Sequence, residues 1–404
     1  HPQLQQLAEK AKEARIQKML TWGYMGPNAT LHGGYTFNQF EAELNMGEAF
    51  EPLAGLFPAG TELDFGEPIV IQPKRFFTGG LSLSQPILNA ATAPAVVAAN
   101  RNVRATDWEV ERDVQRVKAQ TAGAYYQLLA TREAETLSQN AEKLATAQQA
   151  LAQRQLDAGA EPRRTLLQAE LRKSQAGRQV LAATEQRIQA ENAFEVATGL
   201  TSPEELQWGD APADWPSSLE DALSRAKTHR KDLAATALKV EVAKLNTTVM
   251  KLNWLPRIDG KFDLIYSENT GFVDEPFFWT AGIQASLPLW DGGAKLAQVR
   301  RAASQSRLAA VALEQTRKSL THDVRSAWAA HQTAQEAYSA VERELALAQE
   351  NFDLAQKSYQ AGAATWLSVQ EAELGLAQTQ FNQLNARVAL KMAEINVLVA
   401  MGTY

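Results

Sequence analysis

Apolar and small residues recur at alternating intervals of three and four along residues 292–360, a stretch without proline. Seam positions in this stretch include Val299, Leu313, Leu320, Val324 and Phe352. Such spacing predicts a coiled-coil helix, which would span roughly 100 Å at 1.5 Å per residue. Residues 90–157 repeat the spacing through Val96, Val103, Val110 and Val117, so we expect a second long helix there. On periodicity alone, an antiparallel coiled-coil spacer is an equal alternative to a wide assembly.

Polar and apolar side chains alternate in four shorter stretches, 29–40, 76–86, 257–267 and 277–288. Alternation with period two predicts half-buried β-strands. Each stretch has about the ten residues that a tilted strand needs to cross a bilayer. A small soluble sheet is the alternative. Its apolar face would need a partner, however, and the seams of the long helices are already occupied by one another.

Aromatic residues gather where these stretches approach their connecting loops. They are Phe40, Phe76, Phe77, Tyr266, Phe277, Phe278 and Trp279. Membrane-spanning β-barrels carry aromatic girdles at the water–lipid boundaries. We therefore predict that these seven residues form a membrane girdle.

The chain contains two copies of one plan. "QLDAGAEPRRTLLQAEL" around Gly159 corresponds to "SYQAGAATWLSVQEAEL" around Gly362, and the correspondence extends upstream and downstream. We predict a first repeat over 1–200 and a second over 219–404, each with a helix of about 20 residues, two strands, a long helix and a return helix. The return helices are expected at 163–199 and 364–401, and 201–218 is expected to link the repeats. The acidic segment 41–67, rich in Gly and Pro, is predicted to be a long exposed loop.

Four strands cannot close a barrel, and open strand edges are not tolerated in lipid. The chain must therefore oligomerise if its strands lie in a membrane. Two copies would give eight strands, whose interior fills with side chains, whereas three copies give twelve and leave room for water. A transport role favours three.

Composition narrows the function further. The formal net charge is −6, which argues against nucleic acid as a partner, and there is no cysteine. No apolar stretch is long enough for a transmembrane helix. The five histidines show no metal-ligand spacing, and no nucleotide-binding or catalytic motif is present, so we expect no metal, no cofactor and no enzymatic activity. Since the chain begins at His1 without a Met, we interpret it as a product whose targeting segment is not shown.

Several motifs resemble those of TolC-like outer-membrane efflux and secretion channels. They are "SLSQPIL" and "ASLPLWDGG" at the strand-to-helix junctions, "YQLLATREA" in the first long helix, and the two turn motifs quoted above. The resemblance spans essentially the whole chain. It implies a mainly α fold with a tandem repeat, assembled as a homotrimer. In that trimer a 12-strand outer-membrane β-barrel continues into a 12-helix periplasmic α-barrel.

The resemblance also implies a location and a role. The protein would lie in the outer membrane of a Gram-negative bacterium, with a long periplasmic extension. It would be the passive exit duct of a tripartite efflux or type I secretion system. Its partners would be a periplasmic adaptor (a membrane fusion protein) and an inner-membrane pump of the RND, MFS or ABC type. The alternative function is a soluble periplasmic coiled-coil scaffold or adaptor.

By this resemblance, Gly159 and Gly362 mark turns at the periplasmic tip, where the family closes its tunnel. Tyr359 matches the family's gating Tyr, and Glu371 lies where an acidic ring is expected. Other gate positions differ, since Ala364 replaces an Arg, and Ser368 and Thr165 replace Asp residues. A substitute latch in the first repeat is expected from Asp157, Glu161, Arg163 and Arg164. The alternative is that these four charges belong to a solvated helix turn.

Overall fold

The computed structural model describes residues 2–46, 68–209, 214–270 and 275–404. The chain divides into two compact units, and each unit takes segments from both predicted repeats. We call residues 14–103 and 239–309 the sheet unit, and residues 1–13, 104–238 and 310–404 the helical unit. The repeat boundaries at 200 and 219 remain a prediction, because a compact unit is not the same thing as a sequence repeat.

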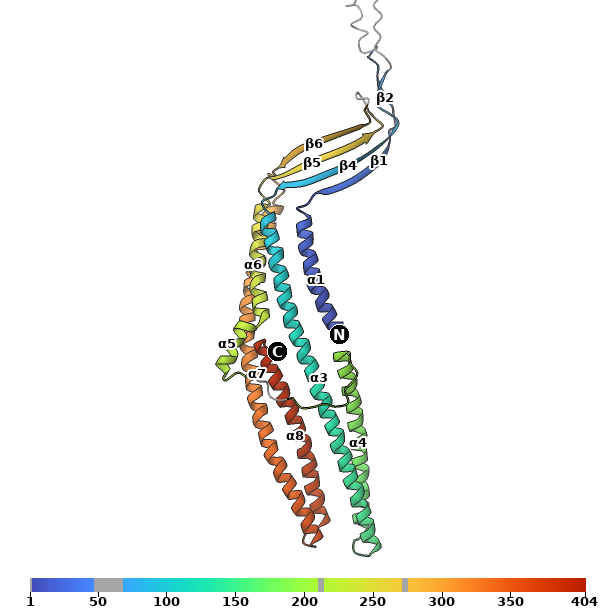
Figure 1. Cartoon of the computed structure of the whole chain (residues 1–404), viewed down its shortest axis with the longest axis vertical. Helices are drawn as coiled ribbons and strands as arrows, with labels where there is room; N and C mark the ends of the chain where they lie inside the picture. The colour runs from blue at the N-terminus through green and yellow to red at the C-terminus, as the bar shows by residue number, and fades with distance from the viewer. Residues whose placement is uncertain (1, 47–67, 210–213, 271–274) are drawn as a thin grey trace, which may run out of the picture. The chain divides into compact units, whose positions relative to one another are not determined.

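A four-stranded antiparallel sheet forms the strand part of the sheet unit (Figure 1). Its strands are β1 (Asn28–Phe37), β4 (Arg75–Leu88), β5 (Arg257–Ser267) and β6 (Phe277–Ser286), in the order β1-β4-β5-β6. The central pair, β4 with β5, joins the first half of the sequence to the second. β1 and β6 are therefore the edge strands of the sheet.

The strand register separates apolar from polar side chains across the whole sheet. Leu31, Leu81, Leu264 and Trp279 are successive cross-strand neighbours on one face. Thr30, Ser82, Asp263 and Thr280 form the adjacent row, whose side chains point to the other face. The alternation seen along each strand thus becomes one apolar face and one mainly polar face.

The predicted loop 41–67 is wrong at its start. Ala42–Leu44 forms strand β2, which pairs with β3 (Ile69–Gln72) in a separate two-stranded sheet. The β-branched run Ile69-Val70-Ile71 favours a strand, and Asn38 anchors the connection by donating a hydrogen bond to the carbonyl of Pro73 at 2.7 Å. The Gly, Pro and acidic content of residues 41–67 favoured a loop, so composition did not predict the short strand β2. Residues 47–67 lie outside the described residues.

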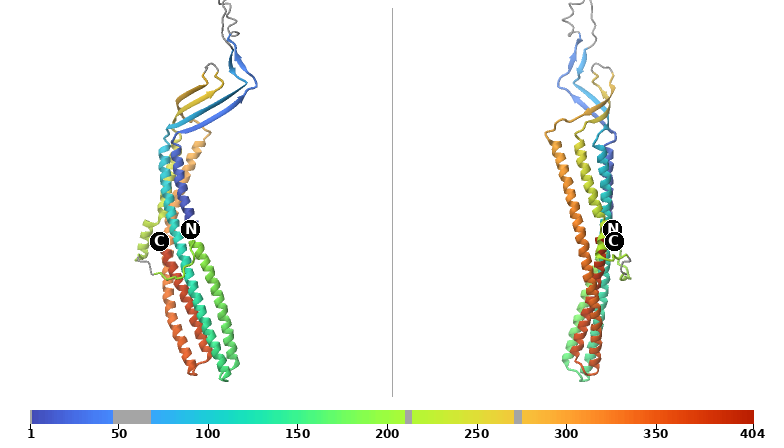
Figure 2. Two further views of the ribbon diagram at one scale, coloured as in Figure 1. Left: turned by 45° about the vertical axis from the view of Figure 1, so that its right-hand side comes forward. Right: turned by 90° about the vertical axis from the view of Figure 1, so that its left-hand side faces the viewer.

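Long helices run through the chain as the seams predict. α3 (Thr92–Asp157) has 66 residues and α7 (Ala294–Gln360) has 67. Seam positions Leu320 and Val324 are buried. Arg317, a charged residue at the seam position between Leu313 and Leu320, is exposed. The return helices are α4 (Arg163–Thr198) and α8 (Trp366–Met401). Figures 1 and 2 show α4 beside α3 and α8 beside α7 in the helical unit.

The first helices of the two halves differ. α1 (Pro2–Gly23) is continuous, but in the second half α5 (Leu219–His229) precedes α6 (Lys231–Leu252). The two are separated by Arg230, whose backbone is extended. Ala222 and Ala226 of α5 pack with Val397 and Met401 of α8 in the main hydrophobic cluster. None of the described helices has a segment both long and apolar enough to cross a bilayer.

Candidate functional site

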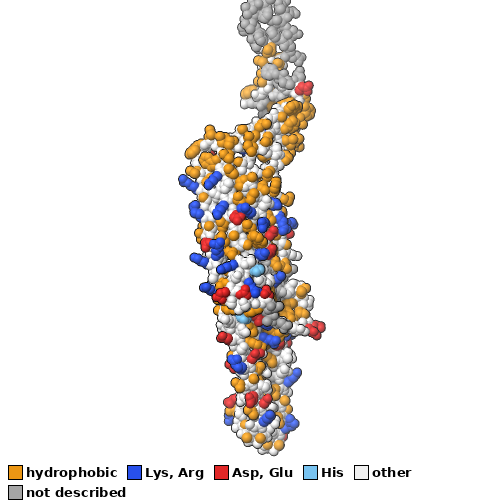
Figure 3. All heavy atoms as spheres, turned by 60° about the vertical axis from the view of Figure 1, so that its left-hand side comes forward, with side chains coloured by type: hydrophobic (Ala, Val, Ile, Leu, Met, Phe, Trp, Pro, Cys, Tyr) orange, Lys and Arg blue, Asp and Glu red, His pale blue; other side chains and the backbone are white. Residues whose placement is uncertain are grey.

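The apolar face of the sheet is uncovered. Leu31 is 83% exposed and Ile283 is 76% exposed, and their in-register partners on this face are Leu81 and Gly260. Hydrophobic side chains gather over the strands in the view of Figure 3. Exposed apolar surface of this extent marks a site for a membrane or another apolar partner.

At the loop ends of the strands this face carries a row of aromatic rings. The ring of Tyr266 lies 4.8 Å from that of Phe277 and 6.2 Å from that of Phe77. Phe77 also pairs in register with Tyr35. The Phe77 ring covers Gly33 and Gly79, which pair in register. A Cβ on Gly79 would lie 3.1 Å from this ring. An aromatic ring over a strand glycine replaces the packing that the glycine lacks.

The predicted girdle is only partly on this face. Phe76 pairs with Thr36 and Phe278 pairs with Ile265, so both point to the opposite, mainly polar face. The reason is the strand period, because consecutive residues such as Phe277 and Phe278 cannot share a face. Phe40 follows β1 and is exposed outside the four-stranded sheet. Phe77, Tyr266, Phe277 and Trp279 are the predicted girdle residues that share the apolar face.

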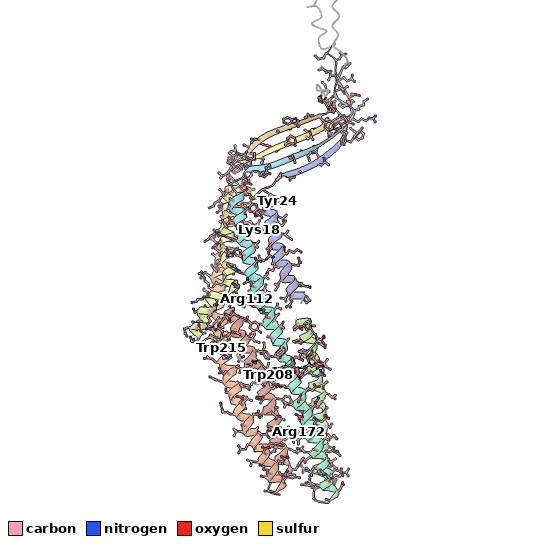
Figure 4. The ribbon with its side chains drawn as sticks, viewed as in Figure 1. Lys18, Tyr24, Arg112, Arg172, Trp208 and Trp215 are labelled. Carbon is pink, nitrogen blue, oxygen red and sulfur yellow. The ribbon has the colours of Figure 1, made fainter. Side chains whose placement is uncertain are left out.

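A second aromatic group lies at the helix ends of the same strands, and sequence reasoning missed it. Its members are Trp22, Tyr24, Trp254 and Trp290, which we call the junction aromatics. All are exposed, Trp290 by 81%. They fall within six residues of a strand end at three strand–helix junctions. Figure 4 labels Tyr24 in the turn between α1 and β1. The sequence feature that could have revealed these residues is a Trp just outside an alternating stretch, because alternation itself does not include it.

Equivalent turns close the two helical hairpins. Gly159 and Gly362 adopt left-handed backbone conformations with φ of 69° and 71°. Ala160 N–H donates to the carbonyl of Gln155, and Ala363 N–H donates to that of Ser358. These bonds are the Schellman pattern, which needs a residue without a Cβ penalty at the left-handed position. The repeated glycines of the sequence are therefore explained by helix termination.

A side-chain hydrogen bond joins the last turns of α3 and α7 in the helical unit. The Tyr359 hydroxyl donates to the side-chain oxygen of Gln155 at 3.3 Å. The Tyr359 ring packs edge-on against Trp366, with centroids 5.5 Å apart. Thr365 caps α8 by accepting a hydrogen bond from the Ser368 N–H. Tyr359 thus holds the turn of one hairpin to that of the other.

The four charges of the predicted latch are not brought together within one chain. Asp157 accepts a hydrogen bond from Gln153, and Glu161 accepts one from Thr165. Arg163 and Arg164 are exposed, and in the described part of the chain neither forms an ion pair. Any latch built from these residues would have to join different chains.

Glu371 lies exposed beside a shallow groove of about 200 Å³ between α4 and α8. Arg172 lines the same groove (Figure 4). Two residues further on, Glu373 is buried and accepts a hydrogen bond from Gln148 at 2.7 Å. Only the first of these two carboxylates is free to face a partner or a pore.

The linker crosses the helical unit as a strap anchored by tryptophans (Figure 4). We call residues 201–209 and 214–218 the strap. Trp208 stacks on Tyr126 of α3, donates to Glu133, and lies 4.4 Å from the guanidinium of Arg387 on α8. Trp215 contacts His331 of α7, with ring centroids 4.5 Å apart. The linker predicted from composition therefore ties α3, α7 and α8 together.

Buried charges lie where α5 meets α6. Arg230 donates to Asp232 and, at 2.8 Å, to Asp323 of α7. Burial opposes ionisation of Asp232, but the hydrogen bonds and charge of Arg230 outweigh it and hold the Asp232 pKa below its usual value. Burial and the nearby charge of Arg230 lower the pKa of Arg112, which donates to the carbonyl of Val399 at 2.8 Å. This network fixes the C-terminal end of α8 against α3.

No cluster of three or more potential metal ligands occurs among the described residues. His331 is buried against Trp215 and Trp328 rather than near another histidine. The sheet has an uncovered apolar face, and the helices form two hairpins. Both features are typical of a surface on which protein chains assemble.

Comparison with known proteins agrees with this geometry. The outer membrane efflux protein family matches residues 72–200 and 222–403. The outer membrane efflux protein BepC of Brucella suis is 25% identical over 329 residues, 80% of this chain and 70% of that protein.

Two solved structures share the fold over the full length of this chain. VceC from Vibrio cholerae has a TM-score of 0.78 at 19% identity, with 93% of its chain covered. The CmeC channel of Campylobacter jejuni has a TM-score of 0.77 at 17% identity, with 83% of its chain covered. Because the family match covers well over half of the sequence, this chain belongs to the outer membrane efflux protein family.

Proposed function

We propose that this protein is a passive exit duct in the outer membrane, serving a tripartite efflux or type I secretion system. The observation that carries the proposal is the exposed apolar face of the sheet, with aromatic residues at both ends of its strands. A soluble sheet of this kind would bury that face, whereas a membrane strand presents it to lipid. Membership of the outer membrane efflux family favours the duct over the soluble scaffold.

The sheet edges support assembly into a closed wall. Among the described residues, no strand pairs with the outer edges of β1 and β6. In lipid each unpaired group costs several kcal/mol, so the edges must meet those of other copies. β1 and β6 run in opposite directions, so a β6 edge can continue antiparallel into the β1 edge of the next copy. Three copies would give a twelve-stranded barrel with an aqueous interior.

Opening would occur at the helical hairpins. The residues of the proposed tip are Asp157, Gly159, Glu161, Arg163, Arg164, Tyr359, Gly362 and Glu371. An adaptor bound to an RND, MFS or ABC pump would separate the hairpins, and the energy would come from the pump, since this chain supplies no nucleotide-binding motif. Contacts such as Tyr359 with Gln155 would set the resting spacing of the two turns.

Extraction and conductance together test the proposal. The protein should remain in the membrane fraction until detergent is added, migrate as a trimer after crosslinking, and form ion-conducting pores in planar bilayers. The scaffold alternative predicts release into buffer and no conductance. A water-soluble monomer would exclude the duct.

A further inference from the structure

Basic residues concentrate in the helical segments of the sheet unit. Residues 14–23, 92–103, 239–252 and 294–309 carry ten Lys and Arg but only one acidic residue, Glu241. The whole chain, by contrast, has an acidic net charge of −6. Figure 3 shows Lys and Arg side chains gathered on the helices next to the strands. This local excess of positive charge favours a negatively charged partner.

Seven of these cations have no acidic partner within the described part of the chain. Two are set aside, because Lys295 donates to the backbone carbonyl of Asn253 and Arg307 lies farthest along α7 from the strands. The other five are Lys18, Lys244, Lys251, Arg300 and Arg301, which we call the basic layer. Glu241, the single acid, is already paired with Arg101 at 3.0 Å. Four of the five side chains are exposed, and Lys18 is half-buried on α1 (Figure 4). Unpaired like charges repel, so anions bound beside them would stabilise this arrangement.

The basic layer lies next to the junction aromatics. Lys251 precedes Trp254 by three residues, and Lys18 precedes Trp22 by four. Lys244, Arg300 and Arg301 lie within about 12 Å of the strand-facing ends of α6 and α7, at 1.5 Å per residue. Trp and Tyr mark the level of lipid headgroups, and long basic side chains extend toward that level. Aromatic and basic residues here are therefore ordered as at a membrane surface.

We propose that the basic layer binds anionic phospholipid headgroups in the periplasmic leaflet of the outer membrane. This inference rests on the proposed membrane location of the sheet. Each headgroup phosphate accepts hydrogen bonds from Lys and Arg, and clusters of basic residues beside a membrane segment bind anionic lipid in this way. The interaction adds to the junction aromatics in fixing the depth of the duct in the bilayer.

Quenching by brominated lipid tests the proposal, because Trp22, Trp254 and Trp290 lie beside the basic layer. The protein is reconstituted in phosphatidylcholine vesicles that contain a minor fraction of brominated phosphatidylglycerol or, separately, of brominated phosphatidylcholine. The ratio of the two quenching curves gives the relative association of the anionic lipid. We expect a preference for phosphatidylglycerol of about fivefold, the effect of one cation near an anionic surface, and a smaller preference at high salt.

The test variant carries Lys18→Gln, Lys244→Gln, Lys251→Gln, Arg300→Gln and Arg301→Gln. A matched control carries Lys143→Gln, Lys318→Gln, Lys357→Gln, Arg325→Gln and Arg343→Gln, five exposed cations of the helical unit that also lack ion pairs among the described residues. The test variant should lose the lipid preference, and the control should keep it. Equal association of both lipids with the wild-type protein would overturn the inference.

Two further outcomes are informative. If the cations instead face the duct and attract anionic cargo, the test variant will change ion selectivity in neutral bilayers and keep its lipid preference, which also overturns the inference. If neither brominated lipid quenches the tryptophans, the sheet is not in the bilayer, and the proposed function itself fails.

Discussion

Gly80 shows how tightly the central strands pack. A Cβ at this position would lie 2.7 Å from the backbone carbonyl oxygen of Leu264 and 3.0 Å from the ring of His32. The backbone cannot move without breaking the β4–β5 pairing, so Gly80→Ala should destabilise the protein by about 1 to 3 kcal/mol. A Cβ on Gly34, which points to the same face, meets only Thr78 at an ordinary 3.8 Å. Thermal unfolding in detergent should show a lower midpoint for Gly80→Ala and an unchanged one for Gly34→Ala.

His331 gives the helical unit a sensitivity to acid. Burial lowers its pKa below the ordinary value of 6.5, against the opposing effect of Glu394. The unfolded chain therefore takes up a proton at a higher pH than the folded one, and stability present above pH 6.5 is lost as the pH falls below it. His331→Gln should reduce the drop in unfolding midpoint between about pH 7.5 and about pH 5.5.

The exposed His229 offers the control for this prediction, since its ring lies on the surface of α5. His229→Gln should leave the pH dependence as in the wild type. Asp232 does not affect the comparison, because the hydrogen bonds and charge of Arg230 outweigh its burial and hold its pKa below the ordinary value for an aspartate. If His331→Gln and wild type lose the same stability on acidification, another group is responsible.

At the level of elements, the strap depends on Trp208. Trp208→Ala removes the stack on Tyr126, the hydrogen bond to Glu133 and the contact with Arg387. We expect a loss of about 2 to 4 kcal/mol, from the buried aromatic surface and the cation–π contact. Trp208→Phe keeps the stacking ring and should lose less.

The rate of proteolysis measures how firmly the strap is held, because the strap contains Glu204 and Glu205. A Glu-specific protease should cut there faster in Trp208→Ala than in Trp208→Phe or the wild type. Equal cleavage rates in all three proteins would mean that the hydrogen bonds from Arg132 to the strap hold it without the tryptophan.

Sequence periodicity predicted the long helices and the strands well, because apolar side chains dominate one face of each of these elements. Both α3 and α7 are longer than 60 residues, and the seam of α7 follows most of its length, so a single exception such as Arg317 did not obscure it. Shorter features were harder to predict. β2 has three residues, and the break at Arg230 depends on Asp323, which lies far away in the sequence. The faces of Phe76 and Phe278 follow from the strand period, which the grouping of aromatic residues by their nearness to loops ignored.

At the scale of the whole molecule, the candidate sites are surfaces between copies of the chain. In the part of the chain that the structure describes, the outer edges of β1 and β6 have no partner strand, and Arg163 and Arg164 at the hairpin turn have no ion pair. Resemblance to the family implied a trimer, and the strand edges of the single chain fit one. Periodicity could not indicate which charged residues of different copies would form ion pairs. Asp157 and Arg163 illustrate this point, since they are close in sequence and still form no ion pair with each other.

Glu371 is the residue at which assembly should become measurable as ion selectivity. In a trimer, three exposed carboxylates would ring the narrow end of the duct and attract cations. Glu371→Gln should lower the cation-to-anion permeability ratio in planar bilayers by roughly half. Glu373→Gln is the matched control, because this carboxylate is buried and bonded to Gln148 within its own chain. It should leave selectivity unchanged. If Glu371→Gln retains the wild-type permeability ratio while the pore still conducts, the selective ring lies at another level of the tunnel.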